Sequence, residues 1–219
     1  MRIGNIELKW LGHSGFLINA GRIIYIDPFK IQGEMPLADI ILITHSHYDH
    51  CSIEDLKKIV KDGTVIIIPA DCQSNITKLN KKIEMQIIEP GDEIEVLGIK
   101  IMGVPAYNIK KQFHPKSEGW LGYILKFNNI IIYHAGDTDL IPEMEKLTGY
   151  SKKGNEFAAL LPVGGNYTMN YEEAAQAAKL IKATITIPMH YGTLAEGKDD
   201  AVKFCELAED VSCKILEKE

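Results

Sequence analysis

Short apolar runs separated by glycine-containing turns dominate the first part of the chain. Runs of this length, rich in Ile and Val, predict β-strands rather than helices. Two of them are almost wholly apolar, which is typical of strands buried on both faces of a sheet. Ser52, with Asp55 as its partner in a capping-box-like pair, begins a helical pattern that ends before Gly63. The strands expected here are Ile6–Trp10, Phe16–Ile18, Ile23–Ile26, Asp39–Ile43 and Thr64–Ile68.

A second group of apolar and alternating runs reads like a meander. The Leu97–Gly98 and Asn128–Asn129 junctions are typical of two-residue hairpin turns. The strands expected in this part are Met85–Ile88, Glu93–Val96, Ile99–Val104, Leu121–Phe127 and Ile130–His134.

Strands and helices alternate near the end of the chain. Apolar strands at Phe157–Val163 and Thr184–Pro188 flank a helix at Tyr171–Lys182, which Asn170 and Glu173 would cap. The last elements expected are a helix at Asp199–Ala208 and a strand at Lys214–Leu216. This order predicts helices on the outer faces of two packed sheets, an α/β architecture. No repeat, linker or low-complexity tract interrupts the pattern, so we expect one domain over residues 1–219.

Composition narrows the class of protein. The chain has 219 residues, 46% hydrophobic and 25% charged, with 24 Lys+Arg against 30 Asp+Glu and a formal net charge of −6. These values are those of a globular protein, and the acidity argues against a nucleic-acid partner. Neither an apolar leader in MRIGNIELKW nor a stretch long enough to span a membrane is present, which predicts a cytoplasmic protein without a membrane partner. A small-molecule partner is expected, and association with further copies of the chain is left open.

The cysteines suggest no sulfur chemistry. They are scattered without a CxxC pair, so the sequence predicts neither a disulfide scaffold nor a thiolate zinc site. Cys51 is interpreted as a small buried residue rather than a ligand. The four are Cys51, Cys72, Cys205 and Cys213.

The string His45-Ser46-His47-Tyr48-Asp49-His50 holds three of the seven histidines. It directly follows a predicted buried strand and precedes a predicted helix, so it lies at the carboxyl end of a strand, where ligand sites of α/β proteins gather. Imidazole and carboxylate donors without thiolate suit Zn²⁺, Fe or Mn²⁺ at a reactive centre. The alternative, a solvated polar loop, does not account for this density of donors.

Several segments, in a fixed order, resemble the metallo-β-lactamase superfamily of metal-dependent hydrolases. Within it, the chain is most similar to small hydrolases related to ascorbate-6-phosphate lactonases. The resemblance implies a four-layer αβ/βα sandwich with metals at one edge. The matching segments are WLGHSGFLI at Trp10–Ile18, IDPF at Ile26–Phe29, THSHYDH at Thr44–His50, YHAGDTD at Tyr133–Asp139, LPVGGNYTM at Leu161–Met169 and IPMHYGT at Ile187–Thr193.

The resemblance implies a centre of two metal ions per chain, Zn²⁺ above all, with Mn²⁺ or Fe²⁺ as alternatives. His45 and His47 would bind the first ion, and Asp49, His50 and His190 the second, with Asp137 bridging the two. The activity implied is hydrolysis of an ester, lactone or phosphodiester bond of a small, anionic substrate by a metal-activated hydroxide. Asp49 would also orient the nucleophile and take its proton.

One position departs from the family. Where the family supplies a further histidine to the first metal, this chain has Asn108, whose amide oxygen is a weaker donor for Zn²⁺. His114 follows shortly after and could complete the site or contact substrate. The alternative is a histidine in a surface loop, beside Pro115 and Lys116.

Other residues receive supporting roles. The resemblance gives His13 a place near the metals, as a substrate contact or support, against a simple turn residue. It gives Asp27 the part of a buried carboxylate that orients the ligand histidines, against a turn cap before Pro28. His134 is interpreted as a buried, hydrogen-bonded histidine behind the site rather than a ligand.

A glycine turn before the helix at Tyr171–Lys182 has the geometry of an anion site, with free backbone N–H groups at a helix N-terminus. Gly165, Asn166 and Tyr167 would bind substrate there, against an ordinary capped turn. Tyr191 could contact the developing oxyanion, with core packing as the equal alternative.

Two other functions stay open. One is an RNA-processing nuclease of the same superfamily, against which the charge of −6 and the lack of a basic arm argue. The other is an iron- or zinc-binding redox or sensing protein that hydrolyses nothing.

Overall fold

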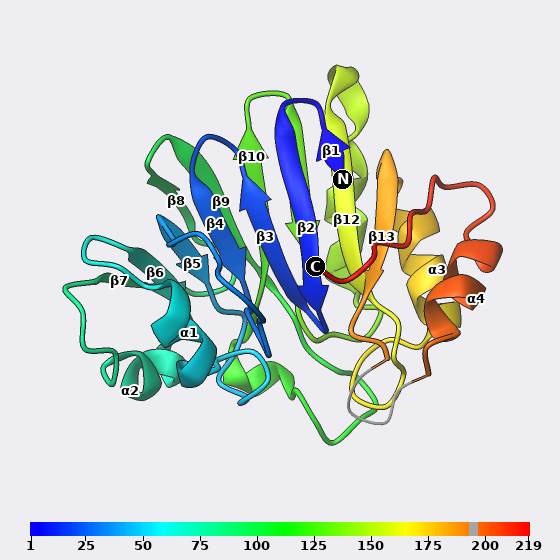
Figure 1. The fold of residues 1–219 in the computed structure, drawn as a ribbon. Helices are drawn as coiled ribbons and strands as arrows, with labels where there is room; N and C mark the ends of the chain where they lie inside the picture. Colours follow the sequence, from blue (N-terminus) through cyan, green and yellow to red (C-terminus); the bar gives the residue numbers. More distant parts are fainter. Residues whose placement is uncertain (193–196) are drawn as a thin grey trace. The chain divides into compact units, whose positions relative to one another are not determined.

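The computed structural model describes residues 1–192 and 197–219. Within them the chain forms two compact units (Figure 1). The first comprises Met1–Glu89 together with Glu217–Glu219, and the second comprises Pro90–Leu216. Whether residues 1–219 make one domain stays a prediction. Among the described helices, none is long and apolar enough to cross a membrane.

The first unit is built on a seven-stranded mixed sheet whose strands lie in chain order. Neighbours from β1 to β4 are antiparallel, and neighbours from β4 to β7 are parallel. The strands are β1 (Arg2–Ile3), β2 (Ile6–Gly12), β3 (Gly15–Asn19), β4 (Ile23–Ile26), β5 (Ile40–Leu42), β6 (Val65–Ile68) and β7 (Glu84–Ile87).

Helix α1 (Ile53–Ile59) covers part of this sheet. Its Leu56 and Ile59 are fully buried in one cluster with Tyr25, Ile41 and Ile66. The predicted helix start is confirmed, because the Ser52 side chain accepts a hydrogen bond from the backbone N–H of Asp55. The central strands β5 and β6 are buried along their whole length, as their apolar sequences predicted. A 3₁₀ turn, η1 (Ala70–Cys72), and the short α2 (Gln73–Ile76) follow β6 and were not predicted.

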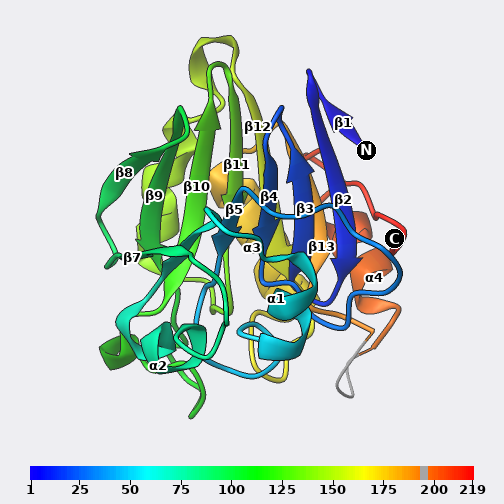
Figure 2. The same cartoon turned by 60° about the vertical axis from the view of Figure 1, so that its left-hand side comes forward.

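The second unit repeats this plan with a six-stranded mixed sheet, whose strands β8 to β11 stand side by side in Figure 2. Neighbours from β8 to β11 are antiparallel, and β11, β12 and β13 are parallel. Both predicted hairpin turns are confirmed, and Leu97, Gly98 and Asn128 have the positive φ angles that such turns need. The strands are β8 (Glu93–Val96), β9 (Ile99–Pro105), β10 (Leu121–Phe127), β11 (Ile130–His134), β12 (Glu156–Pro162) and β13 (Ile185–Met189).

Two helices and three 3₁₀ segments accompany this sheet in the described part of the chain. Helix α3 packs on β12 and on the 3₁₀ segment η3, and α4 packs on α3 and β13. The capping box of α3 is present in full, with Asn170 and Glu173 satisfying each other's backbone N–H groups. Their bounds are η2 (Lys116–Glu118), η3 (Pro142–Gly149), η4 (Lys152–Gly154), α3 (Tyr171–Ile181) and α4 (Asp200–Leu207).

Two expectations about the strands are wrong. The predicted meander does not form one sheet, because β7 pairs with β6 in the first unit and β8 with β9 in the second. No strand forms at Lys214–Leu216. This segment follows an isolated parallel bridge between Thr186 and Cys213, too little pairing to make a strand.

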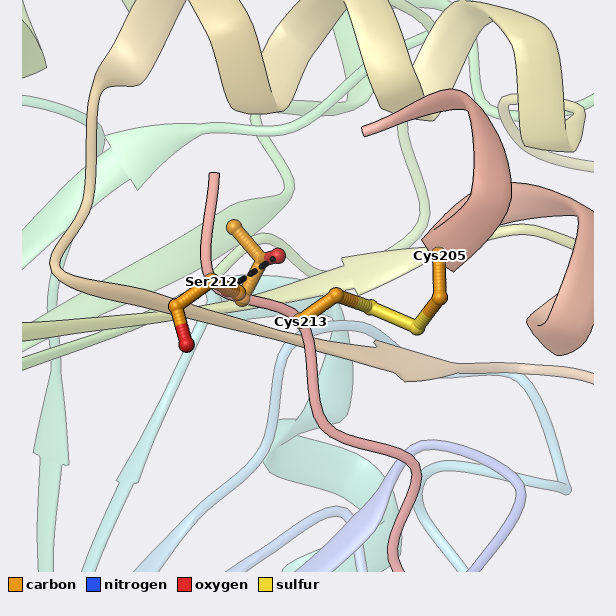
Figure 3. The surroundings of a disulfide bond; sticks show 4 residues. Cys205, Ser212 and Cys213 are labelled. Atoms are coloured by element: carbon orange, nitrogen blue, oxygen red, sulfur yellow. Dashed lines mark hydrogen bonds between the residues drawn. A yellow bond between two sulfur atoms is a disulfide. The ribbon is translucent and has the colours of Figure 1, made fainter. Parts of the chain in front are cut away.

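A disulfide joins Cys205, on α4, to Cys213 (Figure 3). The sequence analysis, which expected no disulfide, is therefore wrong for this pair. The sequence alone did not indicate this disulfide, because the bridge closes only a local turn. In that turn, the carbonyl oxygen of Ser212 accepts two hydrogen bonds from Thr186. Cys51 and Cys72 are free and buried, in keeping with the interpretation of Cys51 as a small buried residue.

Candidate functional site

The candidate residues sit in loops that follow the carboxyl ends of strands in both units. In the first unit they follow β2, β4 and β5, and in the second unit they follow β9, β11, β12 and β13. Carboxyl ends of parallel strands are where α/β folds gather ligand sites, because the loops there are free to vary on a fixed sheet.

In the first unit, the loop after β5 brings imidazole and carboxylate atoms together. His45 Nε2 lies 3.0 Å from His47 Nδ1. Asp49 Oδ2 lies 3.0 Å from His13 Nε2 and 3.8 Å from His50 Nε2. Single ligand atoms of His13, Asp49 and His50 all lie within 4.8 Å of one another. All five side chains except that of His47 are buried.

Asp27 is fully buried beneath this loop and fixes which histidine nitrogens carry protons. Its carboxylate accepts hydrogen bonds from the backbone N–H of Thr44, at 2.8 Å, and from the Thr44 hydroxyl, at 2.5 Å. It also lies 2.7 Å from His50 Nδ1, so that nitrogen is the protonated one and Nε2 keeps a lone pair.

Thr44 extends the same control to His45. The only hydroxyl proton of Thr44 goes to Asp27, so Oγ1 can only accept from His45 Nδ1, which lies 2.9 Å away. His45 Nε2 is then left with a lone pair as well. The sequence analysis gave Thr44 no role, although its position directly before His45 could have suggested a contact with the histidines.

In the second unit, two imidazoles converge on one carboxylate oxygen. Asp137 Oδ2 lies 3.1 Å from His190 Nε2 and 3.3 Å from His114 Nε2, and all three side chains are buried. The surface-loop alternative for His114 is therefore wrong. His114 Nδ1 lies 3.1 Å from the carbonyl oxygen of Tyr167, which makes Nδ1 the protonated nitrogen and Nε2 the lone-pair donor.

Gly136 sets the backbone before Asp137. Its φ is +65°, and a Cβ there would lie 2.5 Å from the carbonyl oxygen of Leu121 in β10. A glycine is therefore needed where the chain that follows β11 passes close to the backbone of β10.

Asn108 is held by its amide nitrogen. Nδ2 donates to the carbonyl oxygens of Tyr167, at 2.7 Å, and Phe113, at 2.9 Å. Two carbonyl acceptors settle the orientation of the amide, so Oδ1 points the other way. That oxygen is buried and has no hydrogen-bond partner within the described part of the chain. An amide oxygen in this state fits a cation or a donor group of a substrate.

Asp139 ties the loop that carries Asn108 to the loop that carries Asp137. Its carboxylate accepts from the backbone N–H of Ile109, at 2.8 Å, and pairs with Lys111. The Thr138 hydroxyl and the Tyr107 backbone bond to each other in the same connection. Asp139 also escaped the sequence interpretation, although it ends the segment YHAGDTD.

Two further candidates are His134 and Tyr191. His134 is fully buried, and its Nδ1 accepts from the backbone N–H of Gly136 at 3.2 Å. Tyr191 is buried, and burial raises its pKa to about 12. Thr193, the last residue of the segment IPMHYGT, lies outside the described residues.

The glycine turn before α3 differs from an open anion site. The backbone N–H of Gly165 donates to the carbonyl oxygen of Met169, and Gly164 forms a bridge with Asn170. Because the Asn170 side chain also accepts from the backbone N–H of Glu173, two of the N–H groups expected to be free, those of Gly165 and Glu173, are used internally. Substrate contacts of Gly165, Asn166 and Tyr167 stay a prediction, but free backbone N–H groups no longer support it. Asn166 and Tyr167 are both exposed.

Strained backbone marks the same residues. Eight described residues other than glycine have a positive φ, and four of them are candidates: His13 at 53°, Asp27 at 43°, His114 at 59° and His190 at 56°. Each such residue costs roughly 1–2 kcal/mol. Strain of this kind gathers where side chains must be aimed, so the angles support a functional role independently of any motif.

The donor sets fit a small divalent cation. Two nitrogen ligands about 2.0–2.1 Å from Zn²⁺ stand about 3.0–3.4 Å apart at common coordination angles. The separations within each unit, 3.0 Å for His45–His47 and 3.1 Å and 3.3 Å around Asp137, lie in this range. In the neutral form, His114 would turn an Nε2 lone pair toward a carboxylate oxygen, an arrangement that a cation between them makes favourable.

Comparison with known proteins identifies the family. A model described as a beta-lactamase superfamily domain matches residues 7–190. A UPF0173 metal-dependent hydrolase of Thermoplasma acidophilum is 33% identical over 219 residues, covering 97% of this chain and 95% of the relative. One from Pyrococcus abyssi is 35% identical over 214 residues, covering 94% and 93%.

Solved structures agree with this. A protein assigned as a metal-dependent hydrolase from Parabacteroides distasonis is 30% identical, with a TM-score of 0.83 over 98% of this chain and 94% of that one. Igni18, described as a metallo hydrolase from Ignicoccus hospitalis, is 25% identical, with a TM-score of 0.76 over 97% and 95%. The predicted fold class is confirmed: it is the metallo-β-lactamase fold. The chain belongs to the beta-lactamase superfamily and, within it, to the UPF0173 family of metal-dependent hydrolases.

Proposed function

We propose that this protein is a hydrolase that depends on two metal ions and cleaves an ester, lactone or phosphodiester bond of a small anionic substrate. The observation that carries the proposal is the set of buried histidines whose hydrogen bonds leave Nε2 lone pairs beside buried carboxylates. The assignment of ligands from both units to one pair of ions rests on family membership, because the matched segment spans residues 7–190. The proposed ligands are His45, His47, Asp49, His50, Asp137 and His190, with Asn108 or His114 completing the first ion.

Zn²⁺ is the proposed metal, at two ions per chain, because imidazole and carboxylate donors in a tight set suit it best; Mn²⁺ and Fe²⁺ accept the same donors. When bound, the ions would polarise the scissile carbonyl or phosphoryl group and lower the pKa of water toward neutrality.

The side chains of the chain itself supply orientation. His13 Nε2, 3.0 Å from Asp49 Oδ2, holds that carboxylate in one rotamer. Asp49 is then placed to hold a proton at Oδ2 during turnover, and His13 is placed to share it. Asp27 and Thr44 keep the ligand histidines in the tautomer that binds metal.

A pocket of about 450 Å³ beside the histidine loop is the proposed substrate entrance of the first unit. Phe29, Ser46, Tyr48 and Ser52 contribute to its lining. Lys30 Nζ lies 5.0 Å from the centre of the Phe29 ring, and that ring contacts His13 edge-on at 5.8 Å. Lys30 makes no ion pair among the described residues, so its charge is the support for an anionic substrate.

The test is metal content followed by substrate screening. The protein, purified without chelator or a histidine tag, is analysed for metal per chain and then assayed on lactones, carboxylic esters and phosphodiesters. We expect about two ions per chain and activity that a chelator removes and Zn²⁺ or Mn²⁺ restores. The variants His47→Ala and His190→Ala should each lose metal and activity. A wild-type protein that takes up no metal on soaking contradicts the proposal.

The other functions predict different results. Tight, strongly salt-dependent RNA binding would favour a nuclease, and an iron-dependent absorption band without hydrolysis would favour a redox or sensing protein. We also propose a cytoplasmic location.

A further inference from the structure

A cavity of about 390 Å³ opens in the second unit between the sheet and η3. Met102, Ile124 and Tyr133 form a row across β9, β10 and β11, where each residue is the register partner of the next. Ile141, Met144 and Leu147 cover this row from the segment of η3. None of the candidate metal ligands lines the cavity.

The cavity lies on the face of the sheet opposite to His134. Tyr133 and His134 are neighbours on β11, and successive side chains of a strand point to opposite faces. The cavity is therefore on the face of the sheet that His134 does not share, and it is distinct from the candidate metal ligands, none of which lines it. Its volume is within the range of small-molecule sites and too small for a helix or strand of a partner protein.

Tyr133 contributes an unpartnered hydroxyl to this cavity. The residue is 1% exposed, and among the described residues its hydroxyl makes no hydrogen bond. Tyr25, which is 0% exposed, shows the usual state of such a residue, because its hydroxyl donates to the carbonyl oxygen of Pro36 at 2.8 Å. The Tyr133 hydroxyl is not among the fully buried atoms that lack a partner, so it faces the open space of the cavity, where a ligand with an acceptor oxygen can bond to it in place of water.

Two charged residues of the lining, Lys116 and Glu143, neutralise each other. Lys116 Nζ pairs with Glu143 Oε1 at 2.9 Å, and Glu143 Oε2 accepts from the Tyr107 hydroxyl at 2.9 Å. Burial raises the pKa of the Tyr133 phenol, so the hydroxyl stays protonated and neutral. Apart from the Lys116–Glu143 pair and Lys146, the residues that line the cavity are apolar or neutral, which favours an occupant with a neutral, apolar body.

We propose that this cavity is a second small-molecule site, which takes a compact, neutral, apolar compound whose carbonyl or ether oxygen accepts a hydrogen bond from Tyr133. The apolar walls would bind the body of the compound, and the hydroxyl would select compounds that carry the oxygen. The site is independent of metal binding, and its ligand need not be the substrate.

The test uses two probes of the same shape, acetophenone and α-methylstyrene, of which only the first has an acceptor oxygen. Binding is followed by NMR of methyl-labelled methionines, since Met102 and Met144 line the cavity and the other five of the seven do not. We expect acetophenone to shift the Met102 and Met144 signals and to bind about fivefold more tightly than α-methylstyrene, the effect of one net hydrogen bond.

Two variants keep the test decisive. Tyr133→Phe removes only the hydroxyl, so it should fold as the wild type does and bind both probes equally. Tyr25→Phe, the matched control, should lose stability but keep the preference for acetophenone. The proposal is overturned if neither probe shifts Met102 or Met144. It is overturned equally if the two probes bind the wild type alike, or if the preference survives in Tyr133→Phe.

Discussion

Asp27 Oδ2 lies 2.7 Å from His50 Nδ1, and the same oxygen accepts the hydroxyl proton of Thr44, which in turn faces His45 Nδ1. One buried carboxylate, in the loop after β4, thus sets the proton positions of two histidines in the loop after the neighbouring strand β5. Its own backbone adopts a φ of +43° to do so. The position of Asp27 directly before Pro28 explains why a simple turn cap was a reasonable alternative in the sequence.

Asp27→Asn is expected to weaken metal binding by about 10- to 100-fold, because an amide cannot accept all three hydrogen bonds and releases the tautomer of His50. Metal affinity measured by competition with a chelator checks this. Asp55→Asn is the control, since Asp55 is also buried in the first unit but bonds to Ser52 and Lys58. An equal loss of metal affinity in both variants would contradict the role of Asp27.

Asn108→Asp is expected to lower the free energy of unfolding of the metal-free protein by about 1–3 kcal/mol. The substitution replaces the amide donor by a carboxylate oxygen that faces the carbonyl oxygens of Phe113 and Tyr167. Urea unfolding measures the effect. The exposed Asn166 stands in a nearby loop, and Asn166→Asp should change stability little, so similar losses in the two variants would refute the explanation.

Asp55 gives a prediction for pH. Burial by itself would raise the pKa of its carboxyl, but hydrogen bonds from Lys58, Ser52 and the backbone of Lys30 outweigh it and hold the pKa below its ordinary value. A group with a lowered folded pKa stabilises the protein above its unfolded pKa and loses that effect as the pH falls through the folded pKa. The destabilisation caused by Asp55→Asn should therefore be largest near pH 7 and shrink below about pH 4. Urea unfolding of wild type and variant at pH 7 and at pH 3 gives the comparison, and a constant difference would argue against it.

The disulfide should stabilise the protein by about 2.5 kcal/mol, the chain-entropy value for a loop that closes over a sequence separation of 8. The double variant Cys205→Ser/Cys213→Ser should unfold at correspondingly lower urea. The native wild type should present no thiol that reacts quickly, because Cys51 and Cys72 are buried. If Cys205 and Cys213 react with a thiol reagent in the folded protein, the bridge does not form in solution.

The sequence predicted most strands to within one or two residues, because apolar runs ended by glycine or asparagine turns leave few alternatives. It could not assign β7 and β8 to different sheets, since pairing between strands depends on contacts far apart in the chain. The string His45–His50 could be predicted as a set of candidate metal ligands from its residue types alone. His114 could not be placed in this way, because its burial depends on the Tyr167 carbonyl, 53 positions away. The sequence wrongly predicted a free backbone N–H at Gly165. The hydrogen bond from Gly165 to the Met169 carbonyl oxygen depends on how the loop folds back, which residue types do not reveal.

Residues Glu217–Glu219 belong to the first unit, although the whole second unit precedes them in the chain. Lys218 forms a bridge with Trp10, and the backbone N–H of Glu219 donates to the Trp10 carbonyl oxygen on the open side of β2. During synthesis on the ribosome, this part of β2 receives its cover only after some two hundred further residues have been added. The nascent protein thus carries an uncovered strand edge throughout translation of the second unit, a period in which chaperone binding or premature pairing with another chain competes with correct completion of the sheet.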